Sequence, residues 1–248
     1  MSMVALFLIA VGIGDLSRPR ITRRWLPPVI GAGALMGGAL LTGLWQLADL
    51  PLLALASITA VGWQVSCERA ERTGDRQIIP LAVFGGGVTA LILLSGWASE
   101  ISGPFGRWLA WTGLTEAVPP DRVLMAAGVL LVQLATANQV VRLILGSVGA
   151  VKPAGEPQPS DQLKGGRLLG PMERLLIVGL GLAGQLTMAS AVVAAKSIIR
   201  FPEISANRDR DGTPQRSGID DVTEYFLVGS FASWILAFAG LALVAVVP

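Results

Sequence analysis

The stretch "RLLIVGLGLAG" (Arg174–Gly184) decides which class of fold the chain has. A short apolar run is followed by Gly-x-Gly-x-x-Gly, the pattern with which Rossmann folds bind the pyrophosphate of a dinucleotide. Such a fold also needs a second strand that ends in an acid about 20 residues further on. Glu203 has nearly this spacing, but it follows Pro202 and precedes a polar sequence without an apolar run. We therefore interpret the stretch as part of a transmembrane helix and expect no dinucleotide cofactor.

The composition of the whole chain also indicates a membrane protein. Of its 248 residues, 52% are hydrophobic and 15% are charged, whereas soluble domains have about 25% charged residues. The 30 glycines fall mostly within apolar segments, for example at Gly33 and Gly37, where small residues let helices in lipid pack closely. Arginine outnumbers lysine, which favours a bacterial source. We expect the protein in the bacterial cytoplasmic membrane, the cell inner membrane.

Several kinds of functional site are excluded because the residues they need are missing. The chain has no histidine, which removes the commonest general base and the usual zinc and haem ligand. Cys67 is the one cysteine, so an intrachain disulfide is excluded. The stretch "NRDRDG" (207–212) begins like a calcium loop, but its twelfth position is Gly218, so we expect a solvated loop. We expect no catalytic residue, no cofactor and no metal ion, and the net charge of +2 argues against a nucleic-acid partner.

Seven segments approach the roughly 20 apolar residues that a helix needs to cross a bilayer. They are residues 2–17, 26–48, 50–66, 77–97, 123–146, 173–199 and 222–247. The predicted fold is an all-α, polytopic transmembrane helix bundle of about seven spans. Residues 1–150 form a five-span membrane region, the proline- and glycine-rich residues 151–166 form a cytoplasmic linker, and residues 167–248 form a two-span hairpin.

Two apolar segments are short and need a separate interpretation. Residues 2–17 have no basic region before them and no cleavage site after them, so we expect a retained anchor instead of a signal peptide. The stretch "GPFGRWLAWTGL" (103–114) is too short to cross the bilayer. We expect an amphipathic helix that lies on the outer surface, and the alternative is an unstructured or re-entrant loop.

The positions of lysine and arginine orient the spans, because these residues collect on the cytoplasmic side. With the N-terminus outside and the C-terminus inside, twelve of the 19 basic residues lie inside. The seven outside are Arg107, Arg122, Lys196, Arg200, Arg208, Arg210 and Arg216. Five of these seven gather between the sixth and seventh spans, which runs against the rule.

The sixth span is predicted as one continuous helix over residues 172–199. Small residues recur at every fourth position and give a stripe on which another helix can pack. They are Gly179, Ala183, Thr187, Ala191 and Ala195. Arg174, Gln185 and Lys196 share another face, since a spacing of eleven is close to three turns. At about 1.5 Å per residue, Arg174 and Lys196 would lie roughly 33 Å apart, one at each membrane surface.

Two ion pairs are suggested by similar depths in the membrane. Arg142 lies at the level of Glu173 near the inner surface, and Lys196 lies at the level of Glu224 near the outer surface. The alternative is that both cations extend to the headgroups, while Glu224 only favours the start of a helix.

The fifth span is polar for a helix in lipid. Besides Arg142 it carries Gln133, Asn138 and Gln139. Hydrogen bonds between helices are the favoured use of such side chains in a bundle. A solute pathway is the alternative, because polar groups within a membrane often mark transport routes.

The C-terminal third contains "GRLLGPMERLLIVGLGLAGQ", "AAKSIIRF" and "EYFLVGSFASW" in this order. It resembles the membrane hairpin of an uncharacterised bacterial integral-membrane family, a domain of unknown function associated with SatD-like regulators. The resemblance implies two membrane segments and no transferable activity. The positions it points to are Glu173, Arg174, Lys196, Ser197, Arg200, Glu224 and Tyr225.

Two functions follow as hypotheses. The first is a non-catalytic scaffold or accessory subunit, whose partners are the lipid bilayer and either other membrane subunits or further copies of the chain. The second is a small-solute transporter or channel that uses the polar faces of the fifth and sixth spans. A buried aqueous cavity joining Asn138, Arg142, Gln185 and Lys196 would favour the second, and a dry interior with charges only at the surfaces would exclude it.

An enzyme that acts within the membrane has the least support. It would need a set of carboxylates that face one cavity. Asp15, Asp49 and Glu100 are too scattered in the sequence to suggest such a set. Enzymatic activity is therefore disfavoured but left open.

Overall fold

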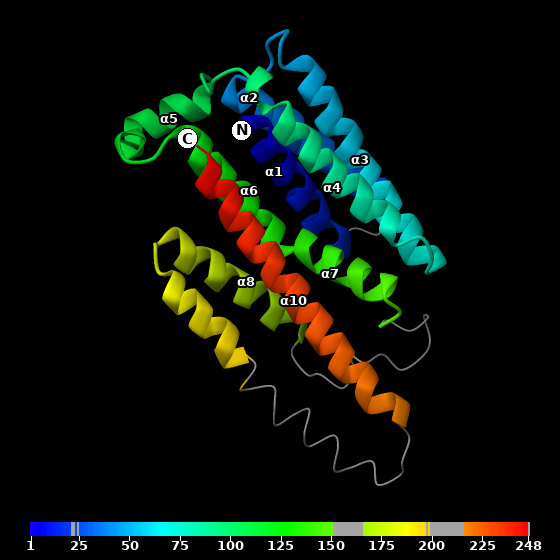
Figure 1. The fold of residues 1–248 in the computed structure, drawn as a ribbon. Helices are drawn as coiled ribbons and strands as arrows, with labels where there is room; N and C mark the ends of the chain where they lie inside the picture. Colours follow the sequence, from blue (N-terminus) through cyan, green and yellow to red (C-terminus); the bar gives the residue numbers. More distant parts are fainter. Residues whose placement is uncertain (21–22, 24, 151–165, 197, 199–215, 248) are drawn as a thin grey trace. The chain divides into compact units, whose positions relative to one another are not determined.

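The computed structural model describes the chain except for residues 21–22, 24, 151–165, 197, 199–215 and 248 (Figure 1). Every described element is a helix, and no strand occurs among the described residues, so the all-α prediction is confirmed. Almost all of the predicted linker, the calcium-like stretch 207–212, Ser197 and Arg200 lie outside the described residues.

The chain forms two compact units, residues 1–136 with 242–248, and residues 137–241. The first unit contains α1 (Ser2–Ser17), α2 (Leu26–Thr42), α3 (Leu50–Thr73), α4 (Ile78–Leu93), α5 (Pro104–Thr112), α6 (Pro120–Leu134) and the 3-10 turns η1 (Arg18–Arg20), η2 (Ser95–Trp97) and η3 (Leu114–Glu116). The second unit contains α8 (Gly166–Leu182), a helix Leu186–Lys196 that we name the return helix, and most of α7 (Thr136–Ser147) and α10 (Arg216–Val246).

Helix α1 is the centre of the first unit. Its sequence is apolar on all sides, and a helix of this kind must be surrounded by other apolar surfaces. In the structure α1 contacts α2, α3, α4 and α6, and Met3, Phe7 and Val11 are buried. The segment that we predicted to be a retained anchor therefore forms the core helix of its unit.

Glycines allow α1 and α6 to approach closely. A Cβ atom at Gly12 of α1 would lie 2.9 Å from Leu131 Cβ of α6, and one at Gly128 of α6 would lie 2.9 Å from the Ala5 carbonyl oxygen of α1. Both distances are too short for a side chain, so glycine is required on each helix. Residue 5 of α1 lies beside residue 128 of α6, and residue 12 lies beside residue 131. Both helices therefore run in the same direction, so α1 and α6 are parallel.

The glycines of α2 that face α1 are Gly31 and Gly38. A Cβ at Gly31 would lie 3.2 Å from the Ala10 carbonyl oxygen, and one at Gly38 would lie 2.7 Å from a leucine side chain of α1. Gly33 and Gly37 have open space beside them. Gly31 and Gly38 share a face because seven residues make about two turns.

The end of α10 lies beside the start of α6. Arg122 Nη2 donates a hydrogen bond of 2.8 Å to the Val247 carbonyl oxygen, within the first unit. Because α1 and α6 run parallel, Met1 lies at this same end. The predicted orientation placed Arg122 outside and the C-terminus inside. The hydrogen bond between Arg122 and Val247 is incompatible with this, because bonded residues must lie on the same side of a membrane.

Fewer helices than expected are long enough to cross a membrane. Among the described residues, α3 and the Thr223–Val246 part of α10 meet the length and hydropathy required, and α6 and α7 meet them together as one broken span. The other apolar helices, α1, α2, α4 and the return helix, have 10–17 residues, and at about 1.5 Å per residue they fall short of a hydrocarbon core of about 30 Å. Two or three spans are thus supported, and the prediction of seven is not confirmed.

A turn interrupts the predicted sixth span. Gly184 has a left-handed backbone with φ of +75°. The amide of Gln185 donates to the Leu180 carbonyl (2.8 Å) and the amide of Gly184 donates to the Gly181 carbonyl (3.0 Å). These two bonds form a Schellman motif, in which a glycine ends the helix. The prediction of one continuous helix over residues 172–199 is therefore wrong.

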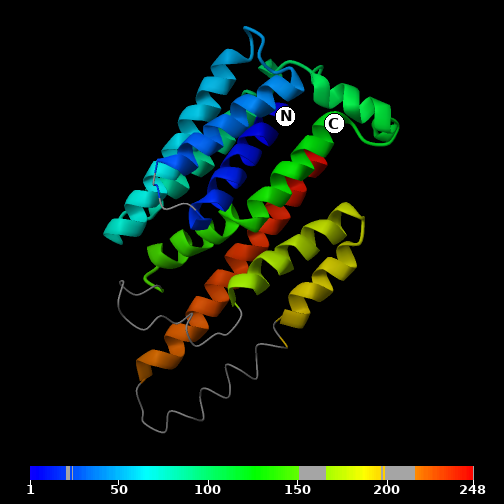
Figure 2. The same ribbon diagram turned by 180° about the vertical axis from the view of Figure 1, so that it is seen from behind.

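Beyond this turn the return helix runs back along α8, as both views of the ribbon show (Figures 1 and 2). Lys196 Nζ lies 2.5 Å from Glu173 Oε2, although the straight helix predicted that Lys196 and Arg174 lie at opposite membrane surfaces. Residues 175–195, which carry no charge, form the two helical arms and the turn of this hairpin. The predicted small-residue stripe is consequently divided between two helices.

Helix α10 runs parallel to α8 in the second unit. A Cβ at Gly181 of α8 would lie 2.6 Å from Leu241 Cδ2, and Glu173, two turns earlier, contacts Trp234. Gly181 is thus the glycine of the Gly-x-Gly-x-x-Gly pattern that serves helix packing. No side chain or backbone atom lies within 4 Å of a Cβ at Gly179.

Candidate functional site

Polar and charged side chains gather in the second unit where the hairpin meets its neighbours. We name this group the hairpin cluster. Its members are Asn138, Glu173, Arg174, Lys196, Ser233 and Trp234. They come from α7, α8, the return helix and α10, so the cluster joins all four helices of this unit.

Glu173 is the anion of the hairpin cluster. Its side chain is 7% exposed, and its carboxylate accepts one hydrogen bond from Lys196 Nζ (2.5 Å) and one from Trp234 Nε1 (2.6 Å). The Lys196 ammonium also lies 5.8 Å from the centroid of the Trp234 ring, which is within the range of a cation–π interaction. The anion therefore connects α8 to the return helix and to α10.

Arg174 uses its planar fork to connect α8 with two other helices. The residue is 2% exposed. Its Nη1 donates to Ser233 Oγ of α10 (2.9 Å), and its Nη2 donates to Asn138 Oδ1 of α7 (2.6 Å). A guanidinium offers donors in a fixed geometry, which suits such a branched link. Arg174 is thus anchored inside the unit by partners on two other helices.

The hairpin cluster lies close to the middle of α10. Trp234 is eleven residues after Thr223, the first residue of the apolar part of α10 that can cross a membrane. At about 1.5 Å per residue, this is about 16 Å along the helix. In a bilayer with a hydrocarbon core of about 30 Å, a charged group halfway along a span would be costly without partners.

Both predicted ion pairs are wrong. Glu173 pairs with Lys196 and not with Arg142, and Glu224 is exposed while Lys196 contacts Glu173. The prediction assumed a straight sixth span, which placed Glu173 and Lys196 at opposite surfaces. The turn at Gly184 brings them together instead.

The remaining predicted site residues do not gather in one cavity. Arg142 is exposed on α7, and Gln185 is exposed at the turn. Gln139 and Tyr225 are half-buried, and each makes an interaction. Asn138 of the predicted cavity set is bound to Arg174. Of the four residues that we expected to line an aqueous path, Asn138 and Lys196 are thus bonded within the hairpin cluster, and Arg142 and Gln185 are exposed.

A second polar group, which the sequence analysis did not find, surrounds Asp15 in the first unit. Trp63 Nε1 donates to Asp15 Oδ2 (3.0 Å), and Gln64 Nε2 donates to Asp15 Oδ1 (3.0 Å). Arg18 Nε lies 3.1 Å from Oδ1, one turn further along the chain. We name these four residues the Asp15 cluster.

Further contacts extend the Asp15 cluster toward the surface. Arg18 Nε donates to Gln64 Oε1 (2.8 Å), and Arg18 Nη1 lies 3.7 Å from Glu71 Oε1. The Thr136 hydroxyl lies near the Asp15 carboxylate without a well-aligned hydrogen bond. Asp15 is thus held by several groups and has no open side for a ligand.

One signal for this cluster was present in the sequence. An acid within an apolar segment is rare, and it usually finds a partner inside the bundle. The two neutral donors, Trp63 and Gln64, lie 48 and 49 residues further along the chain, near the end of the predicted span 50–66. Nothing local in the sequence identifies either of them as a partner of Asp15.

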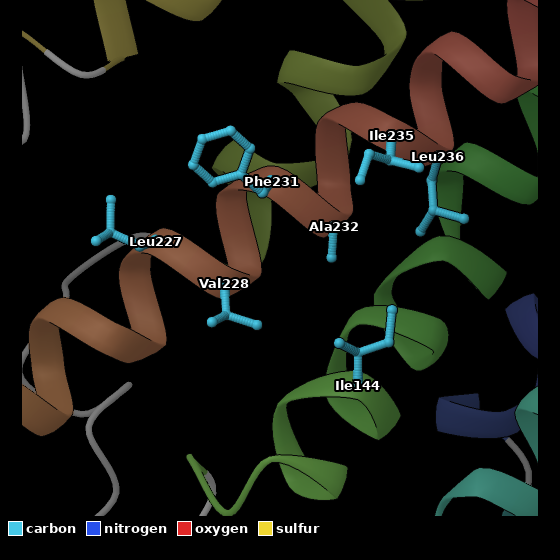
Figure 3. A pocket seen from close by; sticks show the side chains of 7 residues that line it. All are labelled: Ile144, Leu227, Val228, Phe231, Ala232, Ile235 and Leu236. Carbon is cyan, nitrogen blue, oxygen red and sulfur yellow. The ribbon is translucent and has the colours of Figure 1, made fainter.

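The pocket that is visible on the second unit is apolar and open, with a volume of about 410 Å³ (Figure 3). Its walls come from α7 and α10. The lining residues are Ile144, Leu227, Val228, Phe231, Ala232, Ile235 and Leu236. Such a surface suits hydrocarbon and offers no group for catalysis or for a polar solute.

In the part of the chain that the structure describes, no three Cys, Asp or Glu side chains are grouped in a way that could hold a metal ion. No known protein family, no characterised protein and no solved structure matches the chain. Arguments about function therefore rest on the two clusters and on the helices that carry them.

Proposed function

We propose that the chain is a polytopic, non-catalytic scaffold or accessory subunit of a bacterial cytoplasmic membrane. The observation that carries this proposal is that the buried acidic and basic side chains of the described residues all have partners within the fold. These side chains are Asp15, Asp49, Glu173 and Arg174. A transporting or catalytic group would need a face toward a polar cavity, whereas these groups join helices to one another.

Purification from the native membrane tests this proposal. The tagged full chain is extracted in polymer-bounded lipid particles, and the particle mass and composition are measured. We expect the same companion chain, or a second copy, at a fixed ratio in repeated preparations. The control is the same chain expressed in a foreign bacterial host, where a specific companion would be absent. A single chain of 25.9 kDa in the native particles would contradict the proposal.

The proposal includes a new orientation for the chain. Met1 and Val247 lie at the same end of the first unit, which supports an even number of crossings, with both outside. The reversal at Gly184 supports a return of the chain to the side from which α8 starts. Lys196 and the four arginines that follow it then lie inside with the linker. This orientation requires the short helices α1, α2 and α4 to cross as well, in a locally thinner bilayer, together with α3, the pair of α6 and α7, and α10. Arg107 and Arg122 are then the two outer cations of the 19, in agreement with the positive-inside rule.

Labelling with a membrane-impermeant maleimide tests this orientation in intact cells. Cys67 is replaced by serine, and single cysteines are introduced as Ser160→Cys in the linker, Ser205→Cys between the return helix and α10, and Glu116→Cys as the outer control. We expect labelling of position 116 alone before the cells are opened. Labelling at position 205 together with protection at position 160 would support the seven-span orientation instead.

A transporter is the second candidate, and the depth of the hairpin cluster favours it. Three charged side chains near the middle of a span are typical of ion and proton paths. The test uses proteoliposomes that contain a pH-sensitive dye and carry a membrane potential. Proton flux that Glu173→Gln lowers by about tenfold or more, while the exposed-site control Glu224→Gln leaves it unchanged, would support a transporter. Absence of flux in all three proteins would contradict it.

A further inference from the structure

Four exposed tryptophans occur at the end of the first unit where α1 and α6 begin. They lie after α2, in η2 and in α5, and they are Trp45, Trp97, Trp108 and Trp111. Trp111 is 84% exposed. Large aromatic side chains exposed together indicate a surface that contacts something other than water. We name this end of the unit, comprising residues 43–49 and 94–116, the aromatic cap.

The aromatic cap is a fixed structure. Asp49 is buried, and its carboxylate accepts hydrogen bonds from the amides of Ser99 (2.8 Å) and Gln46 (3.1 Å). The Thr42 carbonyl oxygen, at the end of α2, accepts bonds from the amides of Ser102 and Gly103, both 3.1 Å. These bonds tie the connection before α5 to the ends of α2 and α3. The position of α5 is therefore set by the bundle.

The contact with α2 requires glycine on both sides. Gly43 has a left-handed backbone with φ of +81°, and a Cβ there would lie 2.9 Å from the Gly103 amide nitrogen. Side chains at these positions would push α5 away from the bundle. The ribbon shows that α5 runs across the direction shared by α1, α3 and α4 (Figures 1 and 2). A helix in this direction would lie along a membrane surface if the other helices cross the membrane.

Helix α5 has two different faces. Leu109 is buried and Phe105 is half-buried, so this face packs on the protein. Arg107 and Trp111 are exposed on the opposite face, and the exposed Trp108 lies between the two faces, with its ring centroid 6.3 Å from that of Phe105. Tryptophan rings prefer the headgroup level of a bilayer because they combine an apolar ring with an N–H donor. Arginine can reach lipid phosphates from the same level.

We infer that the aromatic cap embeds α5 in the phospholipid headgroup layer of the outer leaflet, with Trp108 and Trp111 at the carbonyl level and Arg107 toward the phosphates. The bound surface is phospholipid and not a partner protein. The four tryptophans of the cap lie at one end of the first unit, and Arg107 is the one charged residue of α5. This inference rests on the proposed membrane location, and it adds a depth for one helix.

The test measures the depth of Trp111 in the full chain reconstituted in phosphatidylcholine vesicles. One variant keeps Trp111 and has phenylalanine at the other six tryptophan positions. A matched variant keeps Trp63, which is fully buried inside the bundle. Fluorescence is quenched by lipids that carry a nitroxide either near the headgroup or near the end of the acyl chain. We expect the shallow nitroxide to quench Trp111 about twofold more than the deep one, and both to quench Trp63 weakly.

Each other result overturns the inference. Quenching of Trp111 by aqueous iodide but by neither lipid would indicate a solvated helix, and stronger quenching by the deep nitroxide would indicate a re-entrant loop. Protection from both lipid and water would indicate a protein partner. Retention of the chain in the vesicles after an alkaline wash tests the membrane location separately. A failure of the proposed membrane location can therefore be distinguished from a failure of the inference about α5.

A second measurement covers the case in which six substitutions prevent folding. Trp111→Cys is made together with Cys67→Ser and labelled with a nitroxide. Electron paramagnetic resonance then compares collision with oxygen, which concentrates in lipid, and with a nickel chelate, which stays in water. We expect comparable access to both at the headgroup level, and access to the nickel chelate alone would contradict the inference.

Discussion

Helix α1 and the hairpin of α8 with the return helix are both short apolar segments, yet they are held in different ways. Side chains on all sides of α1 are buried, and glycines bring its neighbours close. Much of the hairpin surface is exposed, and besides apolar contacts such as those of Ile177 and Val178 it is joined to its neighbours by Glu173, Arg174 and Lys196. Apolar packing positions α1, whereas charge-assisted bonds have a larger share in positioning the hairpin. The two segments should therefore respond to different substitutions.

The largest effect is expected for Glu173→Gln. It removes the anion and leaves Arg174 and Lys196 as two partly or fully buried cations, so we expect a loss of about 3–5 kcal/mol in the free energy of unfolding. Unfolding of the reconstituted full chain in a denaturing detergent measures it. Glu224→Gln, at an exposed position of α10, is the control and should change this free energy by less than about 0.5 kcal/mol. Equal effects of the two would show that the hairpin is not held by charge.

Gly128→Ala tests the packing of α1 and should have a smaller effect. The new methyl group would meet the Ala5 carbonyl oxygen at 2.9 Å, so the two helices must separate, at a cost of about 2 kcal/mol. The matched control is Gly33→Ala, because a Cβ there has no neighbour within 4 Å. Thermal unfolding in detergent compares the two variants. A stable Gly128→Ala protein would mean that α1 and α6 tolerate a wider separation.

Gly184→Ala is expected to have the smallest effect, about 1 kcal/mol, because alanine disfavours a left-handed backbone. Gly179→Ala is the control within the same glycine pattern. It lies inside α8 with free space beside it, and alanine should stabilise the helix by about 0.5–1 kcal/mol. The opposite signs are measurable in the same unfolding assay. A stabilising Gly184→Ala would favour the continuous helix over the hairpin.

The sequence was sufficient to predict the helical class and the helix over residues 104–112, and its apolar segments mostly coincide with described helices. It was insufficient for the turn at Gly184. Glycine within an apolar run is compatible with packing, with a helix end or with both, and hydropathy is the same for each. The spacing of Arg174 and Lys196 also fitted a membrane thickness, which made the straight helix more convincing.

The candidate sites were harder to predict than the helices. Glu173, Arg174, Lys196 and Asn138 were singled out, but their partners depended on whether the chain reverses. Asp15 was noticed and then set aside, because its neutral donors on α3 are far away in the sequence. Depth along a presumed span is a weak guide to contacts when the number of spans is itself unknown.

The bond between Arg122 and Val247 has a consequence for biosynthesis. The donor and the acceptor are 125 residues apart, so Arg122 leaves the ribosome long before its acceptor is made. Chains form their N-terminal parts first during synthesis. The first unit must therefore remain incomplete at one edge until the end of α10 has been made. Docking of this end of α10 is the step that completes a unit whose other helices come from the first half of the chain.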